Sequence, residues 1–193
     1  MSIHFPSVPA TFIHIPKAGG LSFRHWAFDH LKDFDFTRDQ EHSDLIQKHK
    51  YWPNLGTTFT FVRNPYARLV SIYHFVGQRA EMSKKTDQDF KELLIFRKGF
   101  NHWIRNDVEY GDIWSKKKQQ VDWFSNRQVD IILKIEEIDQ DFKKIQELLN
   151  CYEPLPHINK SIHDDYRSYY DQETKKLVEN LCRKDLERFG YDF

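Results

Sequence analysis

The stretch FIHIPKAGGLSF, residues 12–23, runs from an apolar segment through a proline, a lysine and two glycines into an amphipathic segment. The pattern predicts a buried strand over 11–15, a loop over 16–20 and a helix over 21–31. A loop of this kind, between a strand and a helix, presents free backbone N–H groups and is a common site for an anion. The stretch therefore predicts a site for a phosphate or a sulfate.

The side chains of this loop support the same interpretation. Gly19 and Gly20 permit a close approach of the ligand to the backbone. Lys17 adds a mobile positive charge, and Ser22 adds a hydroxyl near the start of the predicted helix. An ordinary strand–turn–helix with an exposed lysine is the alternative interpretation of this stretch taken alone.

The loop differs from the loop that binds ATP or GTP. That loop requires a glycine, four residues, and then Gly-Lys-Ser/Thr. Here Lys17 precedes the glycines, and no Ser or Thr follows a Gly-Lys pair. No acidic partner for magnesium is evident at the end of a strand either. These features argue against a magnesium-dependent nucleotide hydrolase.

The rest of the chain alternates between strand-like and helix-like segments. TTFTFV (57–62) and VDIILKI (129–135) are apolar and β-branched, as buried strands are. Alternation of strands with helices predicts an α/β fold with a mostly parallel sheet covered on both sides. The predicted helices cover 41–50, a segment from Asn64 onward, 88–96, 100–105, 136–149 and 171–188.

Length, charge and composition limit the class of protein. A chain of 193 residues fits one domain, 1–193. The 29 basic and 29 acidic residues balance, which argues against nucleic acid as a partner but allows a local basic pocket. Cys151 and Cys182 form no metal motif or disulfide framework. The N-terminus has no signal-peptide pattern, and no segment reaches the roughly 18 apolar residues of a membrane span, so we expect a cytoplasmic protein.

A second motif, FVRNPYARLVSIY (61–73), follows the predicted strand 57–62. Arg63 stands at the end of the strand, immediately before an Asn-Pro pair that begins a helix. Ser71 follows eight residues later, on that helix. A guanidinium group forks onto a phosphate while a hydroxyl donates from the side. Two anion sites at the ends of two strands indicate a ligand with two well-separated anionic groups.

IPKAGGLSF (15–23) resembles the 5′-phosphosulfate-binding loop of sulfotransferases, and FVRNPYARLVSIY resembles their 3′-phosphate-binding segment. The likeness is greatest to carbohydrate sulfotransferases related to heparan sulfate 2-O-sulfotransferase. Two C-terminal segments, 155–161 and 166–193, are similar to the corresponding section of compact bacterial members. The resemblance thus covers most of the chain.

The resemblance implies a fold, a donor and a reaction. The fold is a three-layer α/β arrangement like that of P-loop-containing nucleotide hydrolases. The donor is 3′-phosphoadenosine 5′-phosphosulfate (PAPS), which leaves as 3′,5′-bisphosphoadenosine. The sulfuryl group passes by direct in-line transfer to an acceptor hydroxyl, on a glycan or a glycosylated metabolite, without a metal.

The resemblance also assigns roles in donor binding. Lys17 matches the lysine that neutralises charge on the bridging oxygen as the sulfuryl group leaves. The next residues would hold the 5′-phosphate through their backbone and a hydroxyl: Ala18, Gly19, Gly20, Leu21 and Ser22. Leu21 stands where the family usually has Thr, and the lost hydrogen bond, worth about 0.5–1.5 kcal/mol, would weaken donor binding several-fold.

The 3′ end of the donor has its own predicted residues. Arg63 and Ser71 match the pair that binds the 3′-phosphate. A polar, basic loop made of Asn159, Lys160 and Ser161 would lie near the 3′-phosphate or the adenine. A solvated loop with no ligand is the alternative for these three residues.

A histidine is the predicted general base, because the acceptor hydroxyl loses a proton as it attacks sulfur. Of ten histidines, His42 opens the predicted helix between the two motifs, where relatives place a histidine facing the acceptor. An exposed histidine in a first helical turn is the alternative, with His49 and Glu41 as the next candidates.

Residues 84–126 carry many aromatics and bases, which fit either a sugar-binding surface or a helical cap with core aromatics.

Two other functions stay open at this point. One is a phosphoryl-transfer or nucleotide-binding enzyme of the same loop superfamily, which would need magnesium and bind ATP. The other is a non-catalytic binding module that kept the fold and lost turnover, for which Leu21 is the support.

Overall fold

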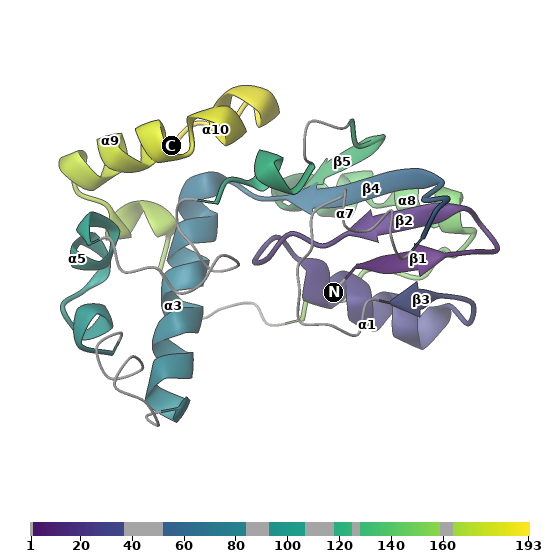
Figure 1. The fold of residues 1–193 in the computed structure, drawn as a ribbon, viewed down its shortest axis with the longest axis horizontal. Coiled ribbons are helices and arrows are strands. Elements are labelled where there is room, and N and C mark those ends of the chain that lie inside the picture. The colour runs from purple at the N-terminus through teal and green to yellow at the C-terminus, as the bar shows by residue number, and fades with distance from the viewer. Residues whose placement is uncertain (1, 37–51, 84–92, 107–117, 125–127, 159–163) are drawn as a thin grey trace. The chain divides into compact units, whose positions relative to one another are not determined.

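The computed structural model describes residues 2–36, 52–83, 93–106, 118–124, 128–158 and 164–193 (Figure 1). The chain divides into two compact units. The first unit takes Met1–Arg63 and Gln120–Lys160, and the second takes Asn64–Gln119 and Ser161–Phe193. A single domain over 1–193 stays a prediction.

The first unit is built on a five-stranded sheet in the order β3-β1-β2-β4-β5. β2 pairs with β4, and β4 with β5, in parallel, whereas β1 is antiparallel to both β2 and β3. The predicted α/β class, with its central parallel strands, is thereby confirmed. The strands are β1 (Ile3–Phe5), β2 (Ala10–Ile13), β3 (Asp35–Phe36), β4 (Thr57–Val62) and β5 (Ile131–Lys134).

The sequence predicted the three strands of the parallel part of the sheet and missed the two that pair only in antiparallel. β4 has the predicted bounds, while β2 ends at Ile13 and β5 at Lys134, each inside the predicted range. β1 and β3 were not predicted. They contain three and two residues, too few for a period of two to be visible in the sequence.

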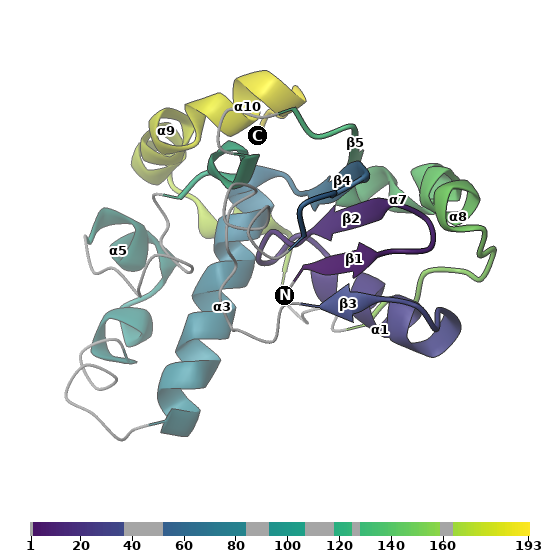
Figure 2. The same cartoon turned by 45° about the vertical axis from the view of Figure 1, so that its right-hand side comes forward.

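Helices α1, α7 and α8 of the first unit pack on one face of the sheet (Figure 2). Phe23 and Trp26 from α1, and Phe142 and Ile145 from the 138–149 region, join the strand side chains in one buried cluster. Phe142 keeps helical backbone angles between α7 and α8, so the predicted helix 136–149 is a nearly continuous helical path. The elements are α1 (Gly20–His30), η1 (Gln120–Phe124), η2 (Ile135–Glu137), α7 (Ile138–Asp141) and α8 (Lys143–Leu149).

Aromatic rings dominate the centre of this cluster. Phe23 is fully buried, and its ring centroid lies 4.4 Å from that of Phe12, 5.4 Å from that of Phe59 and 5.6 Å from that of Phe61. Since side chains alternate along a strand, Thr60 lies on the face of β4 opposite to Phe59 and Phe61. The α1 helix is therefore held to the sheet by one ring that touches both β2 and β4.

The second unit is helical in its described residues. The long helix α3 begins as predicted, because the side-chain oxygen of Asn64 accepts the N–H of Tyr66 at 2.9 Å and Pro65 opens the helix. The predicted helix 171–188 is two helices that meet at the buried Cys182. The elements are α3 (Pro65–Ser83), α5 (Phe100–Arg105), η3 (Tyr166–Tyr169), α9 (Gln172–Leu181) and α10 (Arg183–Phe189).

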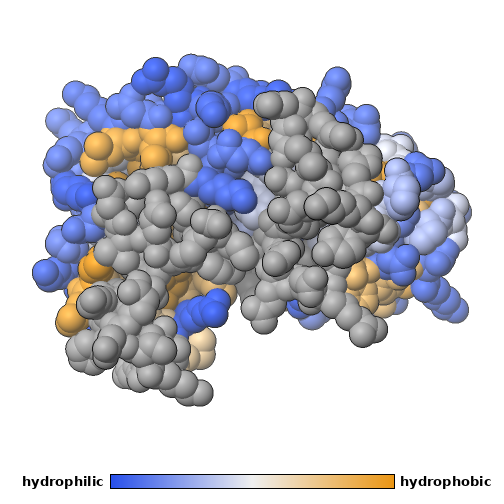
Figure 3. Space-filling model, viewed as in Figure 1, coloured by the Kyte–Doolittle hydropathy of each residue, from blue (hydrophilic) through white to orange (hydrophobic). Residues whose placement is uncertain are grey.

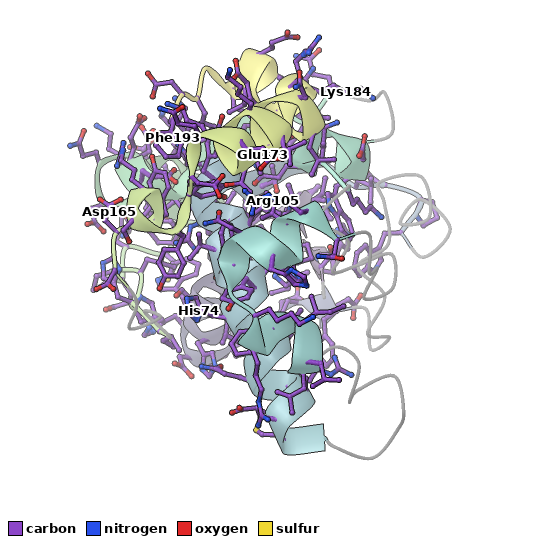
Figure 4. All side chains as sticks on the ribbon, turned by 90° about the vertical axis from the view of Figure 1, so that its left-hand side faces the viewer. His74, Arg105, Asp165, Glu173, Lys184 and Phe193 are labelled. Atoms are coloured by element: carbon purple, nitrogen blue, oxygen red, sulfur yellow. The ribbon has the colours of Figure 1, made fainter. Side chains whose placement is uncertain are left out.

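Ionic contacts join α5 to the start of α9. Arg105 lies beside Glu173, with its Nη2 atom 2.7 Å from a carboxylate oxygen (Figure 4). Asp171 caps α9 by accepting the N–H of Thr174 at 2.8 Å.

The outer surface of α9 and α10 is mainly hydrophilic (Figure 3). None of the helices within the described ranges is long and apolar enough to cross a membrane.

Substitution of Phe23 tests whether this ring holds the first unit together. Phe23→Ala should lower the free energy of unfolding by about 3–5 kcal/mol, the usual cost of truncating a buried phenylalanine. Phe28→Ala is the matched control on the same helix, because Phe28 is 41% exposed, and it should cost about 1 kcal/mol or less. Urea denaturation followed by circular dichroism measures both. Equal losses would contradict this role of Phe23.

Candidate functional site

The two predicted anion-binding segments follow the carboxyl ends of two neighbouring parallel strands. β2 and β4 are parallel neighbours, with Ile13 opposite Thr60. Lys17 follows the end of β2, and Arg63 follows the end of β4 directly. Open α/β sheets bind ligands outside the carboxyl ends of their strands. The first unit thus brings together two of the predicted cationic residues where such a ligand would lie.

The loop after β2 has an unusual backbone. Lys17 has a φ of 67° and Gly19 a φ of 82°, both in the left-handed region. For a lysine this conformation costs roughly 1–2 kcal/mol, and such residues cluster at functional sites. The N–H of Ala18 donates to the carbonyl of Ile15 at 3.4 Å, which closes the turn. The loop therefore has a defined, strained shape in the structure.

Helix α1 begins inside this loop and offers its N-terminus. Gly19 occupies the cap position, and no side chain in the described residues caps the helix. The N–H of Phe23 donates to the carbonyl of Gly19 at 3.3 Å as the first helical hydrogen bond. The N–H groups before it have no acceptor within the helix, and the helix dipole makes this end positive. Both features favour an anion here.

A side chain at either glycine would need its neighbours to move. An ideal Cβ on Gly19 would lie 2.4 Å from the Cδ1 atom of Ile135, the first residue of η2. A Cβ on Gly20 would lie 2.0 Å from the Cδ2 atom and 2.3 Å from the Nε2 atom of His14. The loop backbone thus rests directly on these two side chains. His14 is a titratable group beside the loop that the sequence analysis did not single out, although it stands in the same motif.

The charge on Lys17 is destabilised by its surroundings. Burial, and then the nearby guanidinium of Arg63, lower the pKa of Lys17 to about 8. Each cation makes the charged form of the other less favourable. An anion bound near Lys17 and Arg63 would stabilise the positive charge of both residues and raise the pKa of Lys17. The electrostatics of the loop therefore favour an anionic ligand.

Ser22 has a partner that the sequence did not reveal. Its Oγ atom accepts the N–H of Ile158 at 3.2 Å and lies 3.4 Å from the carbonyl oxygen of the same residue, to which it donates. Nearby, the indole of Trp26 donates to the carbonyl of Glu153 at 2.8 Å. The start of α1 is thereby fixed to segment 153–158. The predicted contact of Ser22 with the donor stays a prediction.

The other predicted site residues are only partly described. Ser71 lies on α3 in the second unit and is 4% exposed, and its pairing with Arg63 on one phosphate stays a prediction. Leu21 is half-buried in the first turn of α1. Four predicted residues lie outside the described residues: His42, Asn159, Lys160 and Ser161.

Comparison with known proteins identifies the family. A sequence model of the sulfotransferase family matches residues 9–192, which is nearly the whole chain and includes both motifs. No curated protein and no solved structure matches the chain. The chain therefore belongs to the sulfotransferase family.

The coupling between Lys17 and Arg63 can be measured without any ligand. Arg63→Met removes the neighbouring positive charge and should raise the pKa of Lys17 above its value of about 8. Arg63→Lys keeps the charge and should leave that pKa low. Competitive acetylation of Lys17 across a pH series, read by mass spectrometry against the exposed Lys143, gives the titration midpoint. The same midpoint in the wild type and in Arg63→Met would contradict the coupling.

Proposed function

We propose that this sulfotransferase moves the sulfuryl group of PAPS to an acceptor hydroxyl, on a glycan or a glycosylated metabolite. The observation that carries the proposal is the placement of Lys17 and Arg63 beyond the ends of two adjacent parallel strands, beside the uncapped start of α1. This arrangement favours a ligand with more than one anionic group. PAPS has such groups on both sides of its ribose, and the family match supports it as the donor.

The donor would be held at its two anionic ends. The loop backbone from Ala18 to Leu21 and the N-terminus of α1 would bind the 5′-phosphosulfate. The guanidinium of Arg63 would bind the 3′-phosphate, which it can contact through two parallel N–H groups. Ser71, together with Asn159, Lys160 and Ser161, would complete the 3′ side. A single half-buried lysine between the strand end and the helix suits the bridging oxygen of the phosphosulfate.

The chemistry would be a single displacement at sulfur. The acceptor oxygen forms a bond to sulfur while the bond from sulfur to the bridging oxygen breaks. The electron pair of that bond passes to the 5′-phosphate, where Lys17 offsets the developing negative charge. His42 takes the proton of the acceptor hydroxyl. Holding donor and acceptor in line supplies much of the rate increase.

The open alternatives differ in what they bind. A phosphoryl-transfer enzyme would bind ATP with magnesium, although the sequence has no Gly-Lys-Ser/Thr. A non-catalytic module would bind the bisphosphate product and show no turnover with any acceptor. A cytoplasmic location also stays a prediction.

Ligand titration tests the donor site before an acceptor is known. Calorimetry should show tight binding of 3′,5′-bisphosphoadenosine, weaker binding of 5′-AMP, and no preference for ATP–magnesium. Arg63→Ala should weaken bisphosphate binding by about 10-fold or more, because a charge-assisted contact contributes about 1.5–3 kcal/mol. The 5′-AMP affinity of this variant should stay within about 2-fold of that of the wild type, since 5′-AMP lacks the 3′-phosphate. ATP–magnesium binding as tight as bisphosphate binding would overturn the proposal.

Turnover tests the two predicted catalytic side chains. With PAPS and a panel of sugar acceptors, Lys17→Met should lower kcat by about 10²–10³-fold, the usual effect of losing one transition-state charge partner. His42→Ala should lower kcat by about 10²–10⁴-fold, as expected for a general base. Release of the bisphosphate measures both. His49→Ala is the control histidine, and a larger loss there than in His42→Ala would reassign the base.

A further inference from the structure

The backbone of Arg63 lies just beyond the hydrogen-bonded part of the sheet. The last pair between β2 and β4 is Ile13 with Thr60, and the last pair between β4 and β5 is Val62 with Lys134. The N–H and the carbonyl of Arg63 therefore need partners from outside the strand ladder.

A single side chain supplies both partners. The Oε1 atom of Gln120 accepts the N–H of Arg63 at 2.9 Å, and the Nε2 atom of Gln120 donates to the carbonyl of Arg63 at 2.8 Å. A neighbouring strand would satisfy a residue in the same two-way manner. The carboxamide of Gln120 thus extends the sheet by one residue on β4.

The environment makes this contact strong and specific. Gln120 is 0% exposed and opens the turn η1, where Trp123 is fully buried as well. Hydrogen bonds in such a dry position hold their partners firmly, and an unsatisfied buried group is costly. A carboxamide carries both a donor and an acceptor, whereas a carboxylate only accepts and a thioether does neither in strength. Glutamine is therefore suited to this place by its chemistry.

The contact also lies at the boundary of the first unit. The chain leaves this unit after Arg63 and returns to it at Gln120. The two hydrogen bonds therefore join the last residue before the chain leaves the unit to the first residue after it returns. The position of the Arg63 backbone is thus set within the first unit, together with the loop that carries Lys17.

We propose that Gln120 is a positioning residue that fixes Arg63 for the 3′-phosphate of the donor. The inference rests on the proposed use of PAPS and adds a residue that neither motif contains. Gln120 would act through the arginine, without touching the donor. Loss of its carboxamide would let the Arg63 backbone shift, and a fork-like contact with phosphate tolerates little displacement.

The test compares two neighbouring glutamines. Gln120→Met keeps the length of the side chain and removes both hydrogen bonds to Arg63. Gln119→Met is the matched control, because the Oε1 atom of Gln119 also accepts backbone N–H groups, from Lys184 at 3.0 Å and Asp185 at 3.3 Å, within the second unit. Calorimetry measures the affinity of each variant for 3′,5′-bisphosphoadenosine and for 5′-AMP.

We expect Gln120→Met to weaken bisphosphate binding by about 10-fold and to change 5′-AMP binding by less than about 2-fold, since two hydrogen bonds that orient one charged contact are lost. Gln119→Met should change neither affinity by more than about 2-fold. If Gln120→Met fails to fold by circular dichroism, Gln120→Asn replaces it. This variant keeps both polar groups on a shorter side chain, and it should show the same selectivity with a smaller loss.

The outcomes separate this inference from the proposed function. Equal weakening of both ligands by the Gln120 variant, or no weakening, would overturn the positioning role while the Arg63→Ala result still supports PAPS binding. If Arg63→Ala leaves bisphosphate binding unchanged, the proposed donor site fails, and the role of Gln120 in it fails too.

Discussion

The parallel pairing of β2 with β4 is the interaction on which the candidate site depends. It sets the register that brings Ile13 opposite Thr60, and the hydroxyl of Thr60 donates to the carbonyl of Ile13 at 2.7 Å. Because both strands run in the same direction, the segments that follow them begin on the same side of the sheet, at the carboxyl ends of the strands. Lys17 and Arg63 are distant in the sequence, and this pairing is what brings their segments together in space.

Bringing two cations together has an energetic cost that the fold tolerates. The pKa of Lys17 is lowered first by burial and then by Arg63, and only the second contribution comes from this repulsion. The strand ladder and the Gln120 carboxamide hold the backbone of Arg63 in place, so a shift of that backbone does not relieve the repulsion. An anion bound beside both cations is attracted to each of them, and this attraction offsets the repulsion between them. Preorganisation of this kind is how protein sites stabilise charge that water would otherwise solvate.

Sequence reasoning succeeded where the information is local. TTFTFV gave the full extent of β4, because a strand buried on both faces reads as a continuous apolar and β-branched run. The Asn64-Pro65 start of α3 depends on one side chain and one ring, so it was predictable too. The two motifs identified the family without any structure.

What the sequence could not predict depends on residues far apart along the chain. Ser22 bonds to Ile158 and Gln120 bonds to Arg63, and the partners in both pairs are far apart in the sequence. The lowered pKa of Lys17 has the same origin, since both burial and the neighbouring arginine are tertiary effects. The two-residue β3 has no pattern to recognise, because its pairing with β1 alone defines it. The two motifs thus predicted which charged side chains belong to the site. The contacts that hold those residues in place come from segments outside the motifs. For Arg63 that contact comes from the residue at which the chain re-enters the first unit, so the first unit holds the backbone of this arginine by its own hydrogen bonds.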